Sequence, residues 1–158
     1  MSSDEPTPTT NPRTNPMLVV AVDLSPESMY ALDLAAAMAA PQRAALRIIH
    51  VHHAPPTLSV SAAATVEFEK AETEIDGLVK KAVSDHLAEF DGEWSLVSRS
   101  GNIAHELLAE AEDVDAGLIV VGHRSHGTVR DFLLGSVASN IVHHSRRSVL
   151  VAIEPKTK

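Results

Sequence analysis

The sequence predicts an α/β protein with one sheet of five mainly parallel strands and helices on both of its faces. Short aliphatic runs, typical of strands buried on both faces, alternate with segments whose apolar residues recur every three or four positions, typical of amphipathic helices. Aromatic residues make up 3% of a chain that is 44% hydrophobic, so its core must consist of Val, Leu, Ile and Ala. Its 158 residues fit one domain. Strands that alternate with helices are joined by right-handed crossovers, which leave the sheet parallel.

The first ordered element is expected at Met17. Residues 1–16 contain four prolines and almost no apolar side chains, so they are expected to form a disordered tail. A buried strand is predicted over Met17–Asp23. Ser25 then supplies an N-cap and Pro26 suits the first position of a helix that runs to about Ala40. A second strand over Ala45–Val51 and a loop from His52 to Ala63 complete this half of the chain.

The second half continues the alternation. A long amphipathic helix is predicted from Thr65 to Phe90, with an inward stripe of Phe68, Ala71, Ile75, Leu78 and Ala82. The later elements are a strand over Trp94–Ser98, a helix capped by Gly101–Asn102, a strand over Gly117–Val121, a helix over Asp131–His144 and a strand over Ser148–Ile153. Residues 154–158 form a polar tail. The pattern alone does not fix the order of the strands in the sheet.

Composition excludes several classes of function. The formal net charge of −8 argues against nucleic-acid binding, which requires a basic face. The absence of cysteine excludes disulfides, thiolate metal sites and cysteine nucleophiles. No apolar run approaches the roughly 20 residues of a membrane span, and the N-terminus lacks the pattern of a secretion signal. We therefore expect a cytoplasmic protein that contacts neither nucleic acid nor membrane.

The segment from Gly122 to Ser136 follows the fourth predicted strand and precedes a helix. A strand, a glycine-containing loop and a helix start, in that order, direct free backbone N–H groups at an anion. Gly122 would let the backbone approach a phosphate, and Gly127 would permit a positive φ. Basic side chains form a local rim: His123, Arg124, His126 and Arg130. The alternative is that Gly122 and Gly135 serve only turns and packing.

These residues also resemble a known family. The chain is similar to the universal stress protein family over Met17–Ile153, whose ATP-binding branch carries Gly-x2-Gly-x9-Gly-Ser/Thr after the fourth strand. Gly122 takes the first place and Gly135-Ser136 the last, whereas Ser125 stands where the second glycine belongs. Flanking segments agree as well: Leu118–Gly122, Phe132–Ala138 and Ser148–Val151. The resemblance implies a flavodoxin-like or adenine nucleotide α-hydrolase-like sheet of order 3-2-1-4-5.

The resemblance further implies an adenine-nucleotide site for ATP, ADP or AMP, with or without Mg²⁺. Asp23 matches the family acid near the nucleoside, although an acid before a helix start is also favoured by the helix dipole alone. Val51 matches the residue whose backbone meets the adenine. The nucleotide-binding residues expected from the loop and the resemblance are Asp23, Val51, Gly122, Arg124, Ser125, Gly127, Gly135, Ser136 and Val137.

The serine at position 125 leaves competing functions open. A side chain there takes up room near the phosphates, and a left-handed conformation would cost roughly 1–2 kcal/mol, although the Ser125 hydroxyl could itself bind a phosphate oxygen. The main expectation is a nucleotide-binding protein with a regulatory or protective role under stress. The alternatives are a nucleotide-free interaction module of the same fold and a slow ATP hydrolase. We find no catalytic motif in the sequence, so dedicated catalysis is not expected.

The nine histidines and the last strand raise two further questions. His50 and His52 would share one face of a strand, but no recognised metal-ligand spacing surrounds them, so no metal site is expected. The strand over Val149–Ile153 is apolar on both faces and would lie at a sheet edge in the order 3-2-1-4-5, where free backbone groups can pair with a second chain. Family members form homodimers in this region, so a homodimer through this strand is expected.

Overall fold

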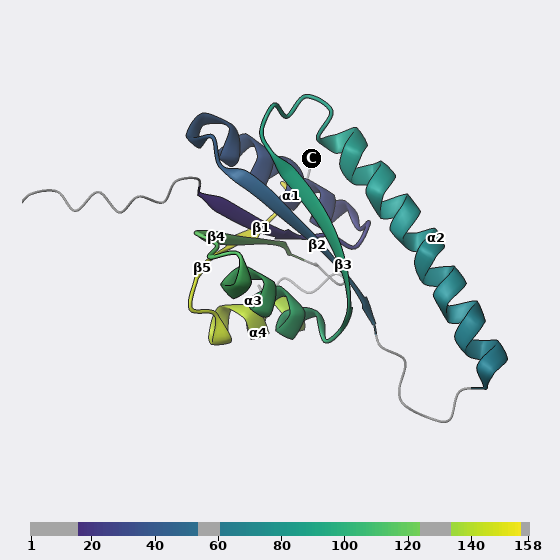
Figure 1. Ribbon diagram of the computed structural model, residues 1–158. Coiled ribbons are helices and arrows are strands. Elements are labelled where there is room, and N and C mark those ends of the chain that lie inside the picture. The colour runs from purple at the N-terminus through teal and green to yellow at the C-terminus, as the bar shows by residue number, and fades with distance from the viewer. Residues whose placement is uncertain (1–15, 54–60, 124–133, 156–158) are drawn as a thin grey trace, which may run out of the picture.

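The computed structural model describes residues 16–53, 61–123 and 134–155, which form a five-stranded sheet flanked by helices (Figure 1). The strands are β1 (Met17–Ala21), β2 (Ala45–His53), β3 (Trp94–Gly101), β4 (Leu118–Gly122) and β5 (Ser148–Ala152). The helices are α1 (Pro26–Ala39), a short 3-10 turn (Ala40–Gln42), α2 (Ala62–His86), α3 (Ile103–Asp113) and α4 (Ser136–His144). The strand order β3-β2-β1-β4-β5, with every pair parallel, confirms the predicted fold. Most of the predicted tail at residues 1–16 lies outside the described residues, as do residues 156–158 at the other end.

The core consists of two layers separated by the sheet. Alternate residues of β1 point to opposite faces, so Val20 packs with α1 and α2 on one side while Val19 packs with α3 and α4 on the other. Leu32 of α1 and Leu107 of α3 are fully buried, one on each side. Figure 1 shows the same division of the helices between the two faces. Because helices cover both faces of the sheet, a ligand can reach it at the ends of the parallel strands.

Helix starts follow the predicted capping residues. The Ser25 hydroxyl accepts a hydrogen bond from the backbone N–H of Ser28 at 3.2 Å, and Pro26 opens α1. Asn102 caps α3 by accepting from the backbone N–H of His105 at 3.0 Å. Both side chains satisfy an N–H group that the helix cannot pair internally.

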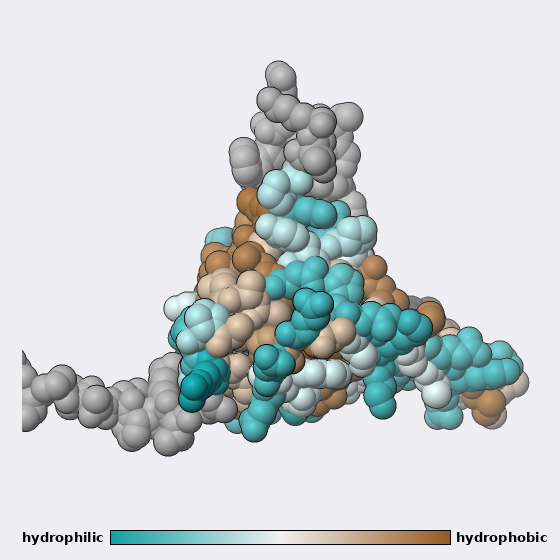
Figure 2. All heavy atoms as spheres, turned by 90° about the horizontal axis from the view of Figure 1, so that it is seen from above, coloured by the Kyte–Doolittle hydropathy of each residue, from teal (hydrophilic) through white to brown (hydrophobic). Residues whose placement is uncertain are grey.

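Helix α2 differs most from the sequence-based expectation. It begins at Ala62 rather than Thr65 and ends at His86 rather than Phe90. Most of the predicted inward stripe is wrong, because Phe68 and Leu78 are exposed, and of the stripe only Ala82 packs against the core. The buried residues of the helix are Val79 and Val83. A helix of 25 residues is about 37 Å long, longer than the strands it covers, so its first half extends past the sheet. In Figure 2, this projecting arm at the right carries polar and apolar residues side by side.

Several other boundaries were also predicted wrongly, among them the end of β3, which lies at Gly101 rather than Ser98. Helix α4 begins at Ser136, so Leu134 and Gly135 lie outside the helix expected from Asp131, and residues 131–133 are outside the described part of the chain. Leu134 is exposed. Strand β2 continues to His53, two residues beyond the predicted end, because β3 pairs with it along its whole final segment.

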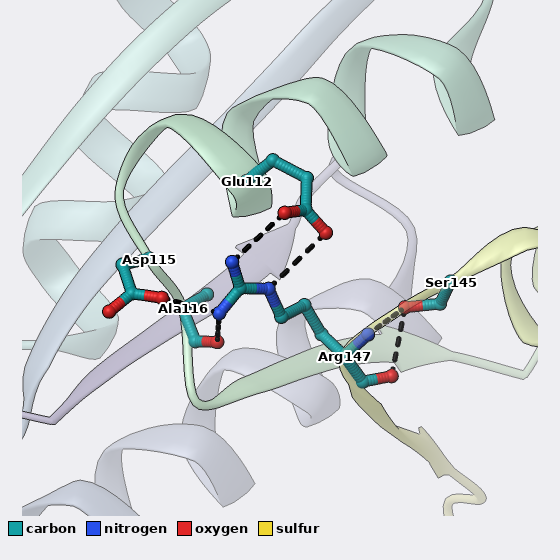
Figure 3. Close-up of polar contacts among 5 residues, drawn as sticks. All are labelled: Glu112, Asp115, Ala116, Ser145 and Arg147. Carbon is teal, nitrogen blue, oxygen red and sulfur yellow. Dashed lines mark hydrogen bonds and ion pairs between the residues drawn. The ribbon is translucent and has the colours of Figure 1, made fainter. Parts of the chain in front are cut away.

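The side chain of Arg147 connects the start of β5 to the end of α3 by hydrogen bonds (Figure 3). Its guanidinium donates to both carboxylate oxygens of Glu112, at 2.9 and 3.3 Å, and to Asp115 at 2.5 Å. It also donates to the backbone carbonyl of Ala116 at 3.2 Å. These contacts hold the pKa of Arg147 above its ordinary value, because its guanidinium donates hydrogen bonds to Glu112 first and Asp115 second. Arg147 therefore anchors the edge strand β5 through side-chain contacts, in addition to the backbone hydrogen bonds of the sheet.

None of the helices in the described ranges is long and apolar enough to cross a bilayer.

Candidate functional site

A pocket lies at the carboxyl ends of β1 and β4, where the winding of the sheet reverses direction. It holds about 900 Å³ of space, including its open mouth. Parallel sheets place ligands at this position because the loops that follow the strands diverge there. The walls come from the end of β1, the first turn of α1, the end of β2, the start of α3, the end of β4 and the start of α4. Of the sequence-predicted residues, the pocket brings together Asp23, Val51, Gly122, Gly135, Ser136 and Val137.

Asp23 is exposed at the rim of the pocket and is bound to the start of α1. Its carboxylate accepts hydrogen bonds from the backbone N–H of Ser25 at 3.1 Å and from the Ser25 hydroxyl at 2.5 Å. Its own backbone N–H donates to the hydroxyl of Ser28 at 3.1 Å. Asp23 therefore orders the turn into α1, which realises one of the two roles expected for it, and it also faces the space that a ligand would occupy.

Val51 contributes its backbone to the pocket wall. The carbonyl of Ile49 accepts from the backbone N–H of Val22, so Ile49 directs its backbone polar groups toward β1. In a parallel strand alternate residues face the same neighbour, so Val51 directs its N–H and C=O in the same direction, beyond Ala21, where β1 ends. This is the position from which a backbone edge can reach a ligand in the pocket.

Gly122 is held by packing against helix α1. A Cβ atom at this position would lie 2.4 Å from the carbonyl oxygen of Glu27 and 2.9 Å from the backbone nitrogen of Ser28. Such contacts are far below van der Waals separation, so the first turn of α1 requires a glycine at the end of β4. The packing interpretation therefore accounts for Gly122 whether or not a ligand is present.

Gly135 is in the opposite situation. Its φ of −53° and ψ of 154° are open to any residue, and a Cβ atom there would have no described atom within 4 Å. Gly135 is the N-cap of α4 and makes no side-chain cap. The first N–H groups of α4, at Ser136 and Val137, therefore have no internal helix partner and border the pocket. A helix N-terminus of this kind attracts an anion through its N–H groups and its dipole.

The middle of the predicted anion loop lies outside the described residues. Arg124, Ser125 and Gly127 belong to residues 124–133, and their expected contacts with phosphate remain predictions. The loop leaves the sheet through His123, whose backbone N–H donates to the carbonyl of Ala152 at 2.8 Å. This bond continues the pairing of β4 with β5 up to the rim of the pocket.

Sequence reasoning missed nine of the fifteen pocket residues, and four of these lie at the starts of α1 and α3. Ser25, Glu27 and Ser28 in the first turn of α1 and Ile103 at the start of α3 line the pocket. Ser25 and Pro26 were recognised only as helix-start signals. The residue types carry no chemical motif, so topology was the one signal available: every loop that follows a strand of a parallel sheet opens at the same edge.

The most deeply buried carboxylate, Glu110, lies on α3 and does not line the pocket. Its oxygens accept from Arg47 Nε at 2.6 Å and from the guanidinium of Arg99, and Arg47 also donates to the Ser95 hydroxyl at 3.0 Å. Burial alone would raise the pKa of Glu110, but the hydrogen bonds from the two arginines outweigh it and lower the pKa. This cluster joins α3 to β2 and β3 and is structural.

Comparison with known proteins gives matches over most of the chain. The model of the universal stress protein family matches residues 17–152. Universal stress protein A homolog 1 of Coxiella burnetii is 34% identical over 137 residues, which cover 84% of this chain and 92% of that protein. The universal stress protein YxiE of Bacillus subtilis is 32% identical over 142 residues, covering 85% of this chain and 96% of that protein.

Solved structures show the same fold. The universal stress protein UspA from Lactobacillus plantarum has a TM-score of 0.73 at 20% identity, covering 87% of this chain and 97% of that one. A universal stress protein in complex with cAMP has a TM-score of 0.66 at 24% identity, covering 88% and 97%. The universal stress protein from Archaeoglobus fulgidus in complex with dAMP has a TM-score of 0.56 at 20% identity, covering 87% and 97%.

Proposed function

Since this chain belongs to the universal stress protein family, we propose that its pocket binds ATP or a related adenine nucleotide and that binding serves a regulatory or protective role under stress. The observation that carries the proposal is the start of α4. The N–H groups of Ser136 and Val137 border the pocket without a side-chain cap from Gly135. Because the net charge of the chain is −8, attraction for a phosphate must come from such local groups.

The opposite wall suits the nucleoside. Asp23 presents carboxylate oxygens that can accept hydrogen bonds from ribose hydroxyls, and Val51 presents a backbone edge that can bind the adenine ring. Ile49 and Ile103 add apolar surface against which a ring can pack. Two proteins of similar fold were solved with cAMP and dAMP, which supports an adenine nucleotide as the class of ligand. Arg124, Ser125 and Gly127 would complete the phosphate contacts, with Mg²⁺ as an accompanying ion.

The test is direct measurement of bound nucleotide. Mass spectrometry of the purified protein should reveal an adenine nucleotide, and MgATP should raise the melting temperature of protein freed of it. A ligand at 100 times its Kd stabilises by about 2.7 kcal/mol, which is about 5–10 °C for a chain of this size. MgGTP is the control and should give a smaller shift. No bound nucleotide and no shift at millimolar MgATP would refute the proposal.

Gly135→Ala isolates the phosphate contact. The added methyl group meets no described atom, so the fold should tolerate it, but it would occupy space beside the N–H groups of α4. We expect a lower affinity for MgATP, while the free energy of unfolding in the absence of nucleotide changes by less than about 1 kcal/mol. An unchanged affinity would show that the phosphates do not approach α4.

The same protein preparation distinguishes nucleotide binding from the two alternative functions. A slow hydrolase would release inorganic phosphate from MgATP over hours, whereas a binding protein would return intact ATP. A nucleotide-free interaction module would show neither binding nor turnover. We further propose a cytoplasmic homodimer through β5. In the part of the chain that the structure describes, this strand pairs only with β4, so one side of its backbone is left for a second chain.

A further inference from the structure

Two histidines and an aspartate converge on the face of β2 opposite to the pocket. His50 and His52 alternate with Ile49 and Val51, which line the pocket, so their side chains point to the other side of the sheet. Asp76 of α2 meets them there, and one potential ligand atom of each of the three residues lies within 4.8 Å of the others. His50 and His52 are 7% and 9% exposed, whereas the Asp76 side chain is 41% exposed and opens the cluster to solvent.

His50 is fixed in orientation by a hydrogen bond on its far nitrogen. Its Nδ1 lies 2.8 Å from the carbonyl oxygen of Val22. A carbonyl oxygen can only accept, so Nδ1 carries a proton, and in the neutral ring the lone pair is then on Nε2. Histidines that bind metals are held in this way, with one ring nitrogen donating to a carbonyl or carboxylate and the other free for the ion.

The other two groups are held at the same place. His52 Nε2 lies 2.8 Å from Asp76 Oδ1, and the rings of His50 and His52 meet edge to face with centroids 4.7 Å apart. The Ser98 hydroxyl donates to the same Asp76 oxygen at 2.6 Å. Burial alone would raise the pKa of Asp76, but the hydrogen bonds from Ser98 and His52 outweigh it and lower the pKa. The hydrogen bonds from Ser98 and His52 also hold the Asp76 carboxylate beside the two imidazole rings.

We propose that His50, His52 and Asp76 form a binding site for a divalent transition-metal ion of the zinc type, separate from the nucleotide pocket. Two imidazole nitrogens and one carboxylate oxygen are a ligand set typical of Zn²⁺, with the fourth position left to water. Ca²⁺ and Mg²⁺ prefer oxygen ligands alone. The second ligand shell is already present in Val22 and Ser98.

Metal binding requires side-chain movements of between roughly half an ångström and about 1.4 Å. Zn²⁺ lies about 2.0–2.1 Å from nitrogen and oxygen ligands, which places tetrahedral ligand atoms about 3.4 Å apart. The 2.8 Å contact of His52 with Asp76 would open by roughly half an ångström, and the widest separation in the cluster would close. The ion would take the position of the proton between His52 and Asp76. Asp76, on a helix with one face in solvent, is the group free to adjust.

The test uses the full chain, stripped with a chelator and free of nucleotide, and Co²⁺ as a spectroscopic probe of the zinc site. We expect one equivalent of Co²⁺ to give the strong visible absorption of a four-coordinate ion, and one equivalent of Zn²⁺ to displace it. Excess Mg²⁺ should not displace it. Asp76→Asn should weaken Co²⁺ binding at least tenfold, and His52→Gln should do the same if the first variant is unstable.

Asp33→Asn is the matched control. Asp33 and His86 form a second His–Asp pair, with His86 Nδ1 2.7 Å from the carboxylate, but they have no third ligand in the described structure. This variant should bind Co²⁺ as the wild type does. Circular dichroism and the melting temperature without metal verify that each variant is folded. Absent visible absorption, or equal loss in Asp76→Asn and Asp33→Asn, would overturn the proposal, and neither result would bear on nucleotide binding.

Discussion

Replacing Gly122 by alanine tests the contact that joins β4 to the first turn of α1. The new Cβ atom would lie 2.4 Å from the carbonyl oxygen of Glu27, 2.6 Å from its carbonyl carbon and 2.9 Å from the nitrogen of Ser28. Ordinary contacts of this kind are about 3.5 Å. The two backbones must therefore separate by about 1 Å, and no side chain can rotate away to relieve the contact.

The expected effect is a large loss of stability. Overpacking costs typically about 1–3 kcal/mol, and we expect about 3 kcal/mol here because backbone meets backbone. For a chain of this length, that corresponds to a fall of about 6–12 °C in melting temperature. Nucleotide affinity should fall too, because Ser28 accepts from the backbone N–H of Asp23 and the displaced turn orders that residue.

Urea unfolding followed by the fluorescence of Trp94, the single tryptophan, measures the loss. Gly135→Ala is the control, since its methyl group meets no described atom and its backbone conformation suits alanine. It should change the free energy of unfolding by less than about 1 kcal/mol. The reasoning is refuted if Gly122→Ala unfolds within about 0.5 kcal/mol of the wild type, or if the two variants lose equal stability.

Three further substitutions have defined outcomes. Glu110→Gln should lower the free energy of unfolding by about 2 kcal/mol near neutral pH. This is below the roughly 3–5 kcal/mol that removing one partner of a buried ion pair usually costs, because both arginines reach solvent. Because the folded-state pKa of Glu110 is lowered, its contribution to stability is present above the unfolded pKa of about 4.3 and is lost as pH falls through the folded value. In urea titrations from pH 3 to 7, the free energy of unfolding of this variant should therefore fall less steeply with acid than that of the wild type. An equally steep fall would contradict the assignment. Arg147→Ala should lower the melting temperature more than Arg146→Ala, which removes the exposed neighbour, because Arg147 joins β5 to α3 through Glu112 and Asp115. Equal losses would exclude the anchoring role. Ile153→Asp, at a side chain that is 52% exposed, should convert a β5-mediated dimer to monomer in light scattering without lowering the melting temperature at low concentration, and an unchanged mass would place the interface elsewhere.

The sheet was predictable because its signals are local. Short aliphatic runs such as Leu118–Val121 have no other stable environment than a strand covered on both faces, and Ser25 and Asn102 mark helix starts by their own chemistry. Helix α2 was mispredicted because periodicity shows which residues share a face but not whether anything covers that face. Its length relative to the strands, a property of the assembled fold, decided that Phe68 is exposed.

The site was predictable only in part for a similar reason. Gly122 and Gly135 look alike in the sequence, and only the position of Glu27 beside one of them separates packing from an open approach. The metal-type cluster was missed because Asp76 comes from α2, far from His50 and His52 in sequence. Ligand spacing identifies sites within one loop or helix, whereas these three side chains meet only after a strand and a helix pack together.

The two halves of α2 differ in how much of their surface is buried, so they should differ in how easily they unfold locally. Its described contacts with the body are concentrated around Asp76, Val79 and Val83, whereas Val66 and Phe68 in its first half are 61% and 48% exposed. Local opening needs least free energy where few apolar side chains are buried. Amide hydrogens in the first three turns of α2 should therefore exchange with solvent well before those of β1 and β4. We expect this fraying to stop at Asp76, whose carboxylate accepts a hydrogen bond from His52.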